Sequence, residues 1–168
     1  PFFFTIYSIC IYFTSAINHL KNYMLHYRNI FVDTDSHSDE KIIDVLSLKN
    51  VAVIGMSKHP SKAAHYVPKY LINNGYDVTP VNPTADTILN SRCYHSVAEI
   101  DGPVDIIDVF RPSDQISSII HDCIEKKPKV IWLQEGIHDF ESEELARKSG
   151  IIVIFNRCML AEHQRLLP

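Results

Sequence analysis

The stretch that decides the fold reads Val51-Ala52-Val53-Ile54-Gly55-Met56-Ser57-Lys58-His59-Pro60-Ser61-Lys62. A run of mostly β-branched residues ends at a single glycine, a short polar and basic loop follows, and helix-like sequence begins after it. This order is typical of a βα turn in which backbone N–H groups at a helix N-terminus meet a phosphate. We therefore interpret the segment from Gly55 to Lys62 as a phosphate-binding loop.

Two features of a dinucleotide site are missing from this region. The loop has no G-x-G-x-x-G pattern, because only Gly55 is present. The next apolar run ends in Asn82-Pro83, where a carboxylate would normally hold the ribose 2′-hydroxyl. The sequence thus predicts a phosphate site that binds NAD and NADP weakly or not at all.

Apolar and helical patterns alternate along the rest of the chain. The apolar runs are nearly continuous, as expected for parallel strands buried on both faces, and they span residues 51–56, 77–81, 104–110, 129–133 and 151–155. Helical patterns occupy residues 38–48, 62–74, 113–127 and 140–149, with a shorter capping-box segment at 96–100. We predict an α/β fold, a Rossmann-like doubly wound sheet of five parallel strands in the order 3-2-1-4-5, with helices on both faces.

Composition limits the function classes. The 168 residues suit one domain with a proper core, and the net charge of -4 argues against a non-specific nucleic-acid binder. None of the four cysteines forms a C-x-x-C pair, which argues against a zinc ribbon or a thioredoxin motif and favours reduced thiols in the cytoplasm. We expect no metal site, and we interpret three histidines as loop or surface residues: His59, His65 and His95.

The N-terminal segment stands apart from this pattern. We assign residues 1–37 to an apolar extension that is non-native or loosely packed, and residues 38–168 to the domain. Residues 2–17 are apolar and uncharged, yet a membrane-spanning helix needs roughly 20 apolar residues. We favour Met24 as the true start, with a genuine membrane anchor as the main alternative; without that anchor we expect no membrane partner.

In a doubly wound sheet, ligands bind at the carboxyl ends of the strands, near the topological switch point. Six blocks of this sequence, most of them covering such strand ends, resemble the small CoA-binding proteins with a Rossmann-like fold. That family is related to the N-terminal domain of the succinyl-CoA synthetase alpha subunit and to NDP-forming acyl-CoA synthetases. The resemblance covers residues 42–166, in the blocks VAVIGMSKHPSKAA, YLINNGYDVTPVNP, CYHSVAEI, VDIIDVFRPS, KVIWLQEGI and GIIVIFNRCMLAEHQRL.

The resemblance implies coenzyme A or an acyl-CoA as the ligand and assigns parts of the site to it. The CoA diphosphate would lie on the glycine loop, at Gly55, Met56, Ser57, Lys58 and Lys62. The adenosine would be bordered by Asn82 and Pro83, the far side of the switch point by Phe110, Arg111 and Pro112, and the pantetheine path by Gln134, Glu135 and Gly136. From the residues alone, Arg111 is either a phosphate contact or a partner for Asp108 or Asp114.

Three functions remain in competition. The first is non-catalytic binding of CoA or acyl-CoA. The second is an acyl-transfer or thiol-dependent enzyme that uses Cys158, although a buried structural thiol is the simpler interpretation of that residue. The third is a regulatory interaction module without a tight ligand; a protein partner or a homodimer is left open. Trp132 is expected in the core, and an acidic cluster is expected in a solvated first helical turn: Glu141, Glu143 and Glu144.

Overall fold

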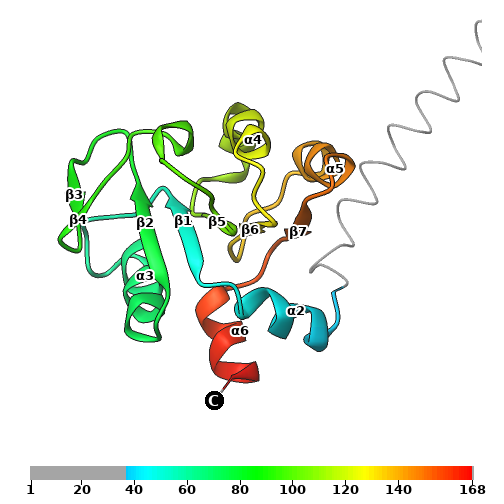
Figure 1. Cartoon of the computed structure of the whole chain (residues 1–168), viewed down its shortest axis with the longest axis horizontal. Coiled ribbons are helices and arrows are strands. Elements are labelled where there is room, and N and C mark those ends of the chain that lie inside the picture. The colour runs from blue at the N-terminus through cyan, green and yellow to red at the C-terminus, as the bar shows by residue number, and fades with distance from the viewer. Residues whose placement is uncertain (1–36, 168) are drawn as a thin grey trace, which may run out of the picture. The chain divides into compact units, whose positions relative to one another are not determined.

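Five parallel strands form the central sheet of the computed structural model, which describes residues 37–167 (Figure 1). The interpretations of the apolar extension and of Met24 fall on residues outside that range. The strands are β1 (Asn50–Ile54), β2 (Asp77–Val81), β5 (Ile106–Val109), β6 (Val130–Leu133) and β7 (Ile152–Ile154). They are arranged in the order β2-β1-β5-β6-β7. The Rossmann-like α/β class is confirmed.

The strand order fits the 3-2-1-4-5 pattern after one reassignment. A parallel bridge between Val81 and Tyr94 places the segment at Tyr94 on the outer side of β2, so this segment counts third along the chain and β5, β6 and β7 follow as fourth, fifth and sixth, one position more than the pattern has. The run at residues 104–110, which we counted third from the sequence, contains β5 and pairs with the other side of β1. The chain therefore leaves β1 in one direction toward β2 and later returns to its other side, so the switch point lies between β1 and β5.

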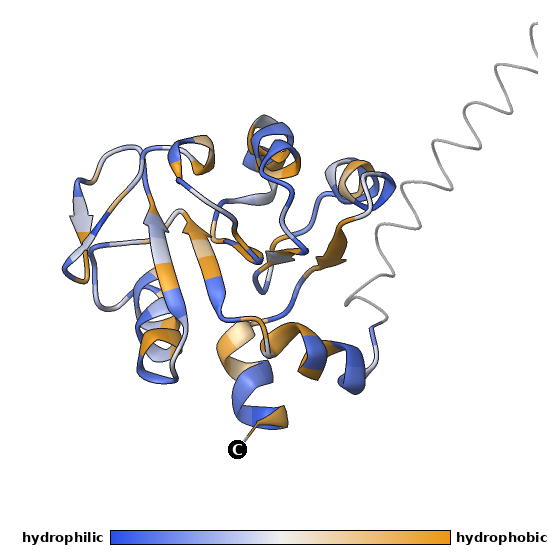
Figure 2. Ribbon diagram, viewed as in Figure 1, coloured by the Kyte–Doolittle hydropathy of each residue, from blue (hydrophilic) through white to orange (hydrophobic). Residues whose placement is uncertain are grey.

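Helices cover both faces of the sheet (Figure 1). One face carries α2 (Asp39–Leu46), α3 (Ala63–Asn73) and α6 (Met159–Leu166). The other carries α4 (Ile116–Glu125) and α5 (Phe140–Lys148), together with a short 3-10 helix at Val97–Glu99. Successive strand residues alternate between two buried clusters, one on each face, as the pleat of a strand requires. Figure 2 shows the hydrophobic residues gathered on the strands and hydrophilic residues on the helices' outer sides.

Local signals predicted most helix ends correctly. Ser38 caps α2, its hydroxyl accepting from the backbone N–H of Lys41 at 3.3 Å. Two elements were missed: α6, and the two-stranded hairpin of β3 (Thr87–Ile88) and β4 (Ser91–Arg92). The side chain of Cys158, which precedes α6, makes no capping hydrogen bond, so that helix begins without a sequence signal.

Gly55, the residue after β1, lies beside Phe110, the residue after β5. Its φ is +84°, a conformation that favours glycine. A Cβ added there would lie 3.1 Å from the carbonyl oxygen of Phe110 and 3.4 Å from Cδ of Arg111. The glycine is therefore needed by the turn itself and by its backbone neighbour, before any ligand is considered.

We expect Gly55→Ala to lower the free energy of unfolding by on the order of 2 kcal/mol, because it combines an unfavourable φ with a backbone clash. Gly150→Ala is the matched control, since Gly150 has φ +80° but nothing within 4 Å of an added Cβ. Chemical denaturation of both variants measures the difference. Equal losses at the two positions would show that the approach to Phe110 carries no cost.

Candidate functional site

The loop between β1 and α3 is held by internal hydrogen bonds. The backbone N–H of Ser57 donates to the carbonyl oxygen of Ala64 at 2.9 Å, and the Ser57 hydroxyl oxygen accepts from the N–H of His59 at 3.1 Å. The ring of His65 bonds the carbonyl oxygen of Ser57 through Nδ1 at 2.7 Å. His65 is buried, so its interpretation as a loop or surface histidine is wrong. It fixes the loop from the first turn of α3.

The start of α3 offers unpaired donors beside positive charge. The first N–H groups of any α-helix have no partner inside the helix. Within residues 37–167, the N–H groups of Ala63 and Ala64 find no acceptor, and Lys62 caps the helix without a side-chain hydrogen bond. Lys58 and Lys62 are both exposed on the same loop. This arrangement can bind a phosphate group through backbone donors and charge.

Asn82 joins the end of β2 to this loop. Its side-chain amide donates to the carbonyl oxygen of Met56 at 2.8 Å. Its oxygen accepts from the N–H and the hydroxyl of Thr84, at 2.8 and 2.9 Å. The side chain of Met56 is fully buried in the core. Both residues therefore shape the loop with groups that are already engaged within the protein.

A small pocket opens at the carboxyl ends of β1, β2 and β5. Its volume is about 80 Å³, and its lining combines apolar and polar groups: Ile54, Val81, Pro83, His95, Ser96, Val97, Arg111, Ile119 and Asp122. Arg111 is half-buried there and pairs with neither Asp108 nor Asp114, so the protein-partner interpretation of this arginine is wrong. Phe110 is also half-buried, whereas Pro112 is exposed.

Gln134 lies in the core rather than in the crevice. It is 4% exposed, donates to Oδ1 of Asp108 at 2.8 Å through Nε2, and accepts from the N–H of Met159 at 3.4 Å. Glu135 and Gly136, the next two residues, are exposed. Of these three predicted pantetheine contacts, only Glu135 and Gly136 are accessible.

Asp108 is a fully buried carboxyl group in the middle of β5. Burial raises its pKa to about 7, against the lowering effect of the hydrogen bond from Gln134. Its second oxygen, Oδ2, has no hydrogen-bond partner. Asp108 is therefore costly to ionise in the folded protein.

We expect Asp108→Asn to gain stability over the wild type as pH rises. The folded chain holds a proton on Asp108 between about pH 4 and pH 7, and the unfolded chain releases it, so the wild type loses stability across that window. Asparagine cannot titrate and escapes this loss. Urea denaturation of both proteins at pH 4, 5.5, 7 and 8.5 measures the difference. A difference that stays constant over this range would contradict the neutral state of Asp108.

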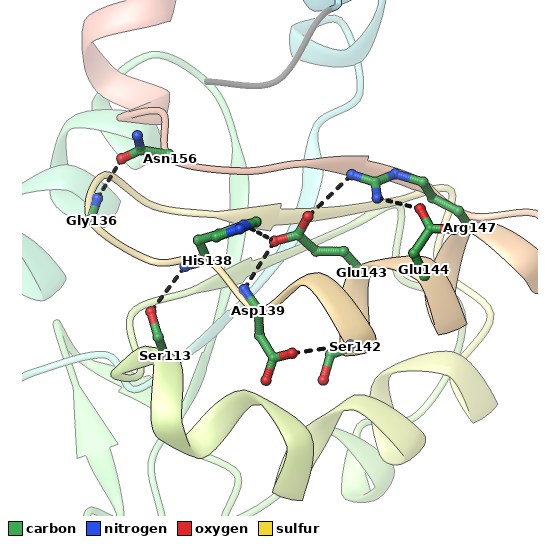
Figure 3. A network of polar contacts seen from close by, with 9 residues as sticks. All are labelled: Ser113, Gly136, His138, Asp139, Ser142, Glu143, Glu144, Arg147 and Asn156. Carbon is green, nitrogen blue, oxygen red and sulfur yellow. Dashed lines mark hydrogen bonds and ion pairs between the residues drawn. The ribbon is translucent and has the colours of Figure 1, made fainter. Parts of the chain in front are cut away.

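A polar network links the loops after β5, β6 and β7 (Figure 3). Glu143 lies at its centre and is 1% exposed. Its carboxylate accepts from the N–H of Asp139 at 3.0 Å, and it bonds His138 Nδ1 at 2.6 Å and Arg147 at 3.2 Å. His138 donates its backbone N–H to the hydroxyl of Ser113 at 3.0 Å. Glu143 is therefore a buried anchor of this loop, and placing it in a solvated turn was wrong.

Glu143→Ala should lower the free energy of unfolding by about 2–3 kcal/mol, because it removes a buried carboxylate and leaves the part-buried N–H of Asp139 and the ring of His138 without their acceptor. Glu144→Ala is the control, since Glu144 contacts the same Arg147 but is 40% exposed, and its loss should cost below about 0.5 kcal/mol. Thermal or chemical denaturation separates them. Similar losses of unfolding free energy in both variants would show that the contacts of Glu143 contribute no more to stability than those of an exposed carboxylate.

Two further predictions concern side chains near the end of the sheet. Trp132 is fully buried and donates its indole N–H to the carbonyl oxygen of Arg157 at 2.7 Å, which confirms its core assignment. Cys158 is half-buried against the core, and no histidine among residues 37–167 hydrogen-bonds its thiol.

Among residues 37–167 there is no cluster of three potential metal ligands, and no helix has the length and apolar character to cross a bilayer.

Fold and site together define a class of protein: a doubly wound α/β domain with a glycine-containing loop after its first strand and a small pocket at its switch point. Comparison with known families makes this specific. Residues 49–164 match the model of the CoA binding domain, and the chain belongs to that family. The resemblance drawn from the six sequence blocks is confirmed.

Relatives of two sizes share this domain. The chain is 36% identical over 115 residues to the uncharacterized protein YneT of Bacillus subtilis, covering 68% of this chain and 85% of that protein. It is 34% identical over 120 residues to acetate–CoA ligase (ADP-forming) II of Archaeoglobus fulgidus, covering 64% of this chain but only 18% of the ligase. The domain thus occurs both nearly alone and as a small part of large enzymes.

Solved structures agree with this assignment. A hypothetical protein from Pyrococcus horikoshii superposes with a TM-score of 0.78 at 36% identity, covering 82% of this chain and 96% of that one. A protein from Thermus thermophilus gives a TM-score of 0.76 at 38% identity, covering 78% of this chain and all of that one (100%).

Proposed function

We propose that this protein binds coenzyme A or an acyl-CoA at the carboxyl edge of its sheet, without itself catalysing a reaction. The observation that carries the proposal is the start of α3, where the free N–H groups of Ala63 and Ala64 stand beside Lys58 and Lys62. A diphosphate bound there would receive backbone hydrogen bonds and two positive charges. Membership in the CoA binding domain family supports this ligand.

The remaining parts of CoA follow from the edge of the sheet. The adenosine would enter the pocket at Pro83, whose floor of Ile54, Val81 and Val97 suits the face of an aromatic base. The pantetheine arm would pass over the exposed backbone at Glu135 and Gly136. Gln134, Asn82 and Met56 would act behind this surface by holding the loops in place.

The two competing functions find less support in the described residues. A thiol-dependent enzyme needs a base that activates the thiol, and no histidine is hydrogen-bonded to Cys158. Unpaired helix donors beside two exposed lysines favour an anionic ligand over a regulatory module without a tight ligand. The ligase relatives contain this domain within much longer chains, so their whole activity is not assigned to this domain.

We expect CoA to raise the melting temperature of the protein, while NAD, FAD and ATP at equal concentration shift it little, because binding to the native state stabilises it. Lys62→Ala should weaken CoA about tenfold in calorimetry, since a charge-assisted contact to phosphate is lost. Lys129→Ala is the control, because Lys129 pairs with Asp105 at the opposite edge of the sheet. A micromolar affinity for NAD, or no shift with CoA, would refute the proposal.

A further inference from the structure

Resting on the proposed function, we propose that Arg111 binds the 3′-phosphate of coenzyme A, so that the site selects CoA over 3′-dephospho-CoA. Coenzyme A carries this phosphate monoester on its ribose, next to the diphosphate. Dephospho-CoA, NAD and FAD have the diphosphate but lack the monoester. In this proposal, the pocket lined by Arg111 determines specificity, and it is separate from the loop of residues 55–62 that binds the diphosphate.

Arg111 differs from the other arginines of residues 37–167 in its contacts. Arg147, Arg157 and Arg165 each form an ion pair with a glutamate or aspartate. Arg92 is exposed and lies over the ring of Tyr94 at 4.8 Å. Arg111 alone has neither a carboxylate nor an aromatic partner within that part of the chain, although it is half-buried. Because no carboxylate in this part of the chain pairs with it, the guanidinium of Arg111 has its N–H donors available for an oxyanion.

The position of Arg111 suits a second phosphate beside the first. Its Cδ lies 3.4 Å from the Cβ position of Gly55, so its side chain passes directly beside the turn that opens the phosphate loop. The same side chain lines the pocket that extends from this turn toward β2. A ribose lying between the loop and the pocket would therefore present its diphosphate to α3 and its 3′-phosphate to Arg111.

The other polar groups of the pocket are compatible with this ligand. Ser96 precedes a 3-10 helix without capping it, so its hydroxyl is available as a donor. Asp122 is the one carboxylate in the lining; it forms no ion pair with Arg111 and can accept a hydrogen bond from the amino group of adenine. Repulsion between Asp122 and a phosphate is limited when the phosphate bonds Arg111 in a bidentate manner, which places it at the arginine end of the pocket.

The experiment compares two ligands across four proteins by calorimetry. We expect the wild type to bind CoA at least about tenfold more tightly than 3′-dephospho-CoA, the scale of a hydrogen bond to a charged group. Arg111→Gln should bind CoA only as tightly as dephospho-CoA, with the dephospho-CoA affinity unchanged. Arg111→Lys should keep part of the preference, because it retains the charge without the bidentate geometry. Arg92→Gln, which removes the same charge from the exposed hairpin, should behave as wild type.

Three results overturn the assignment. Equal wild-type affinities for the two ligands show that the 3′-phosphate is not recognised. Equal weakening of both ligands in Arg111→Gln shows that Arg111 contacts the diphosphate or stacks on the base. Tight binding of neither ligand by the folded wild type refutes the proposed function itself, which distinguishes that failure from the first two. If Arg111→Gln does not fold, the wild-type ratio and Arg111→Lys decide.

Discussion

The close approach of Gly55, just after β1, to the backbone of Phe110, just after β5, is the constraint on which the site depends. The carbonyl oxygen of Phe110 lies where a Cβ of residue 55 would be too close, and the turn takes a φ of +84°. The chain turns at Gly55 and continues to α3, whose first N–H groups lie at the carboxyl edge of the sheet. Arg111, the residue after Phe110, lies beside the same glycine turn, with its Cδ 3.4 Å from the Cβ position of Gly55. The loop after β1 and the pocket that Arg111 lines are thus both positioned by the contact between Gly55 and Phe110.

Buried and half-buried polar side chains hold the loops at the carboxyl edge of the sheet in place. His65 and Asn82 hold the glycine loop from α3 and from β2. Glu143 holds the loop after β6 through the N–H of Asp139. Such buried networks are stable only when their members are satisfied, and they fix geometry more than they contribute affinity. Preorganised loops reduce the entropy lost on binding, which suits a site built on backbone donors.

The buried pair of Asp108 and Gln134 differs from these networks, because one of its polar atoms has no hydrogen-bond partner. Asp108 keeps one oxygen without a hydrogen-bond partner in the core, and burial of such a group is costly. Through Gln134 it is linked to the N–H of Met159, the first residue of α6. The pair therefore connects the middle of β5 to the first residue of α6.

The sequence by itself determined the strands, most helices and the glycine turn after β1, because these depend on local patterns. Continuous β-branched runs identify buried parallel strands, and Ser38 marks a helix start within a few residues of the helix it caps. Residue types at the strand ends were also enough to indicate a CoA family. These signals do not depend on where distant segments lie.

Only the tertiary structure decided which polar residues are buried and which are exposed at the carboxyl edge of the sheet. The neighbour of β1, the start of α6 and the burial of Glu143, His65 and Gln134 depend on contacts between segments far apart in the chain. Arg111 shows the reason most clearly. Its sequence neighbours Asp108 and Asp114 suggested ion pairs, but the strand buries the first, and neither reaches the guanidinium. The sequence gives the charge of each side chain, whereas tertiary packing decides which oppositely charged group lies close enough to form an ion pair with it.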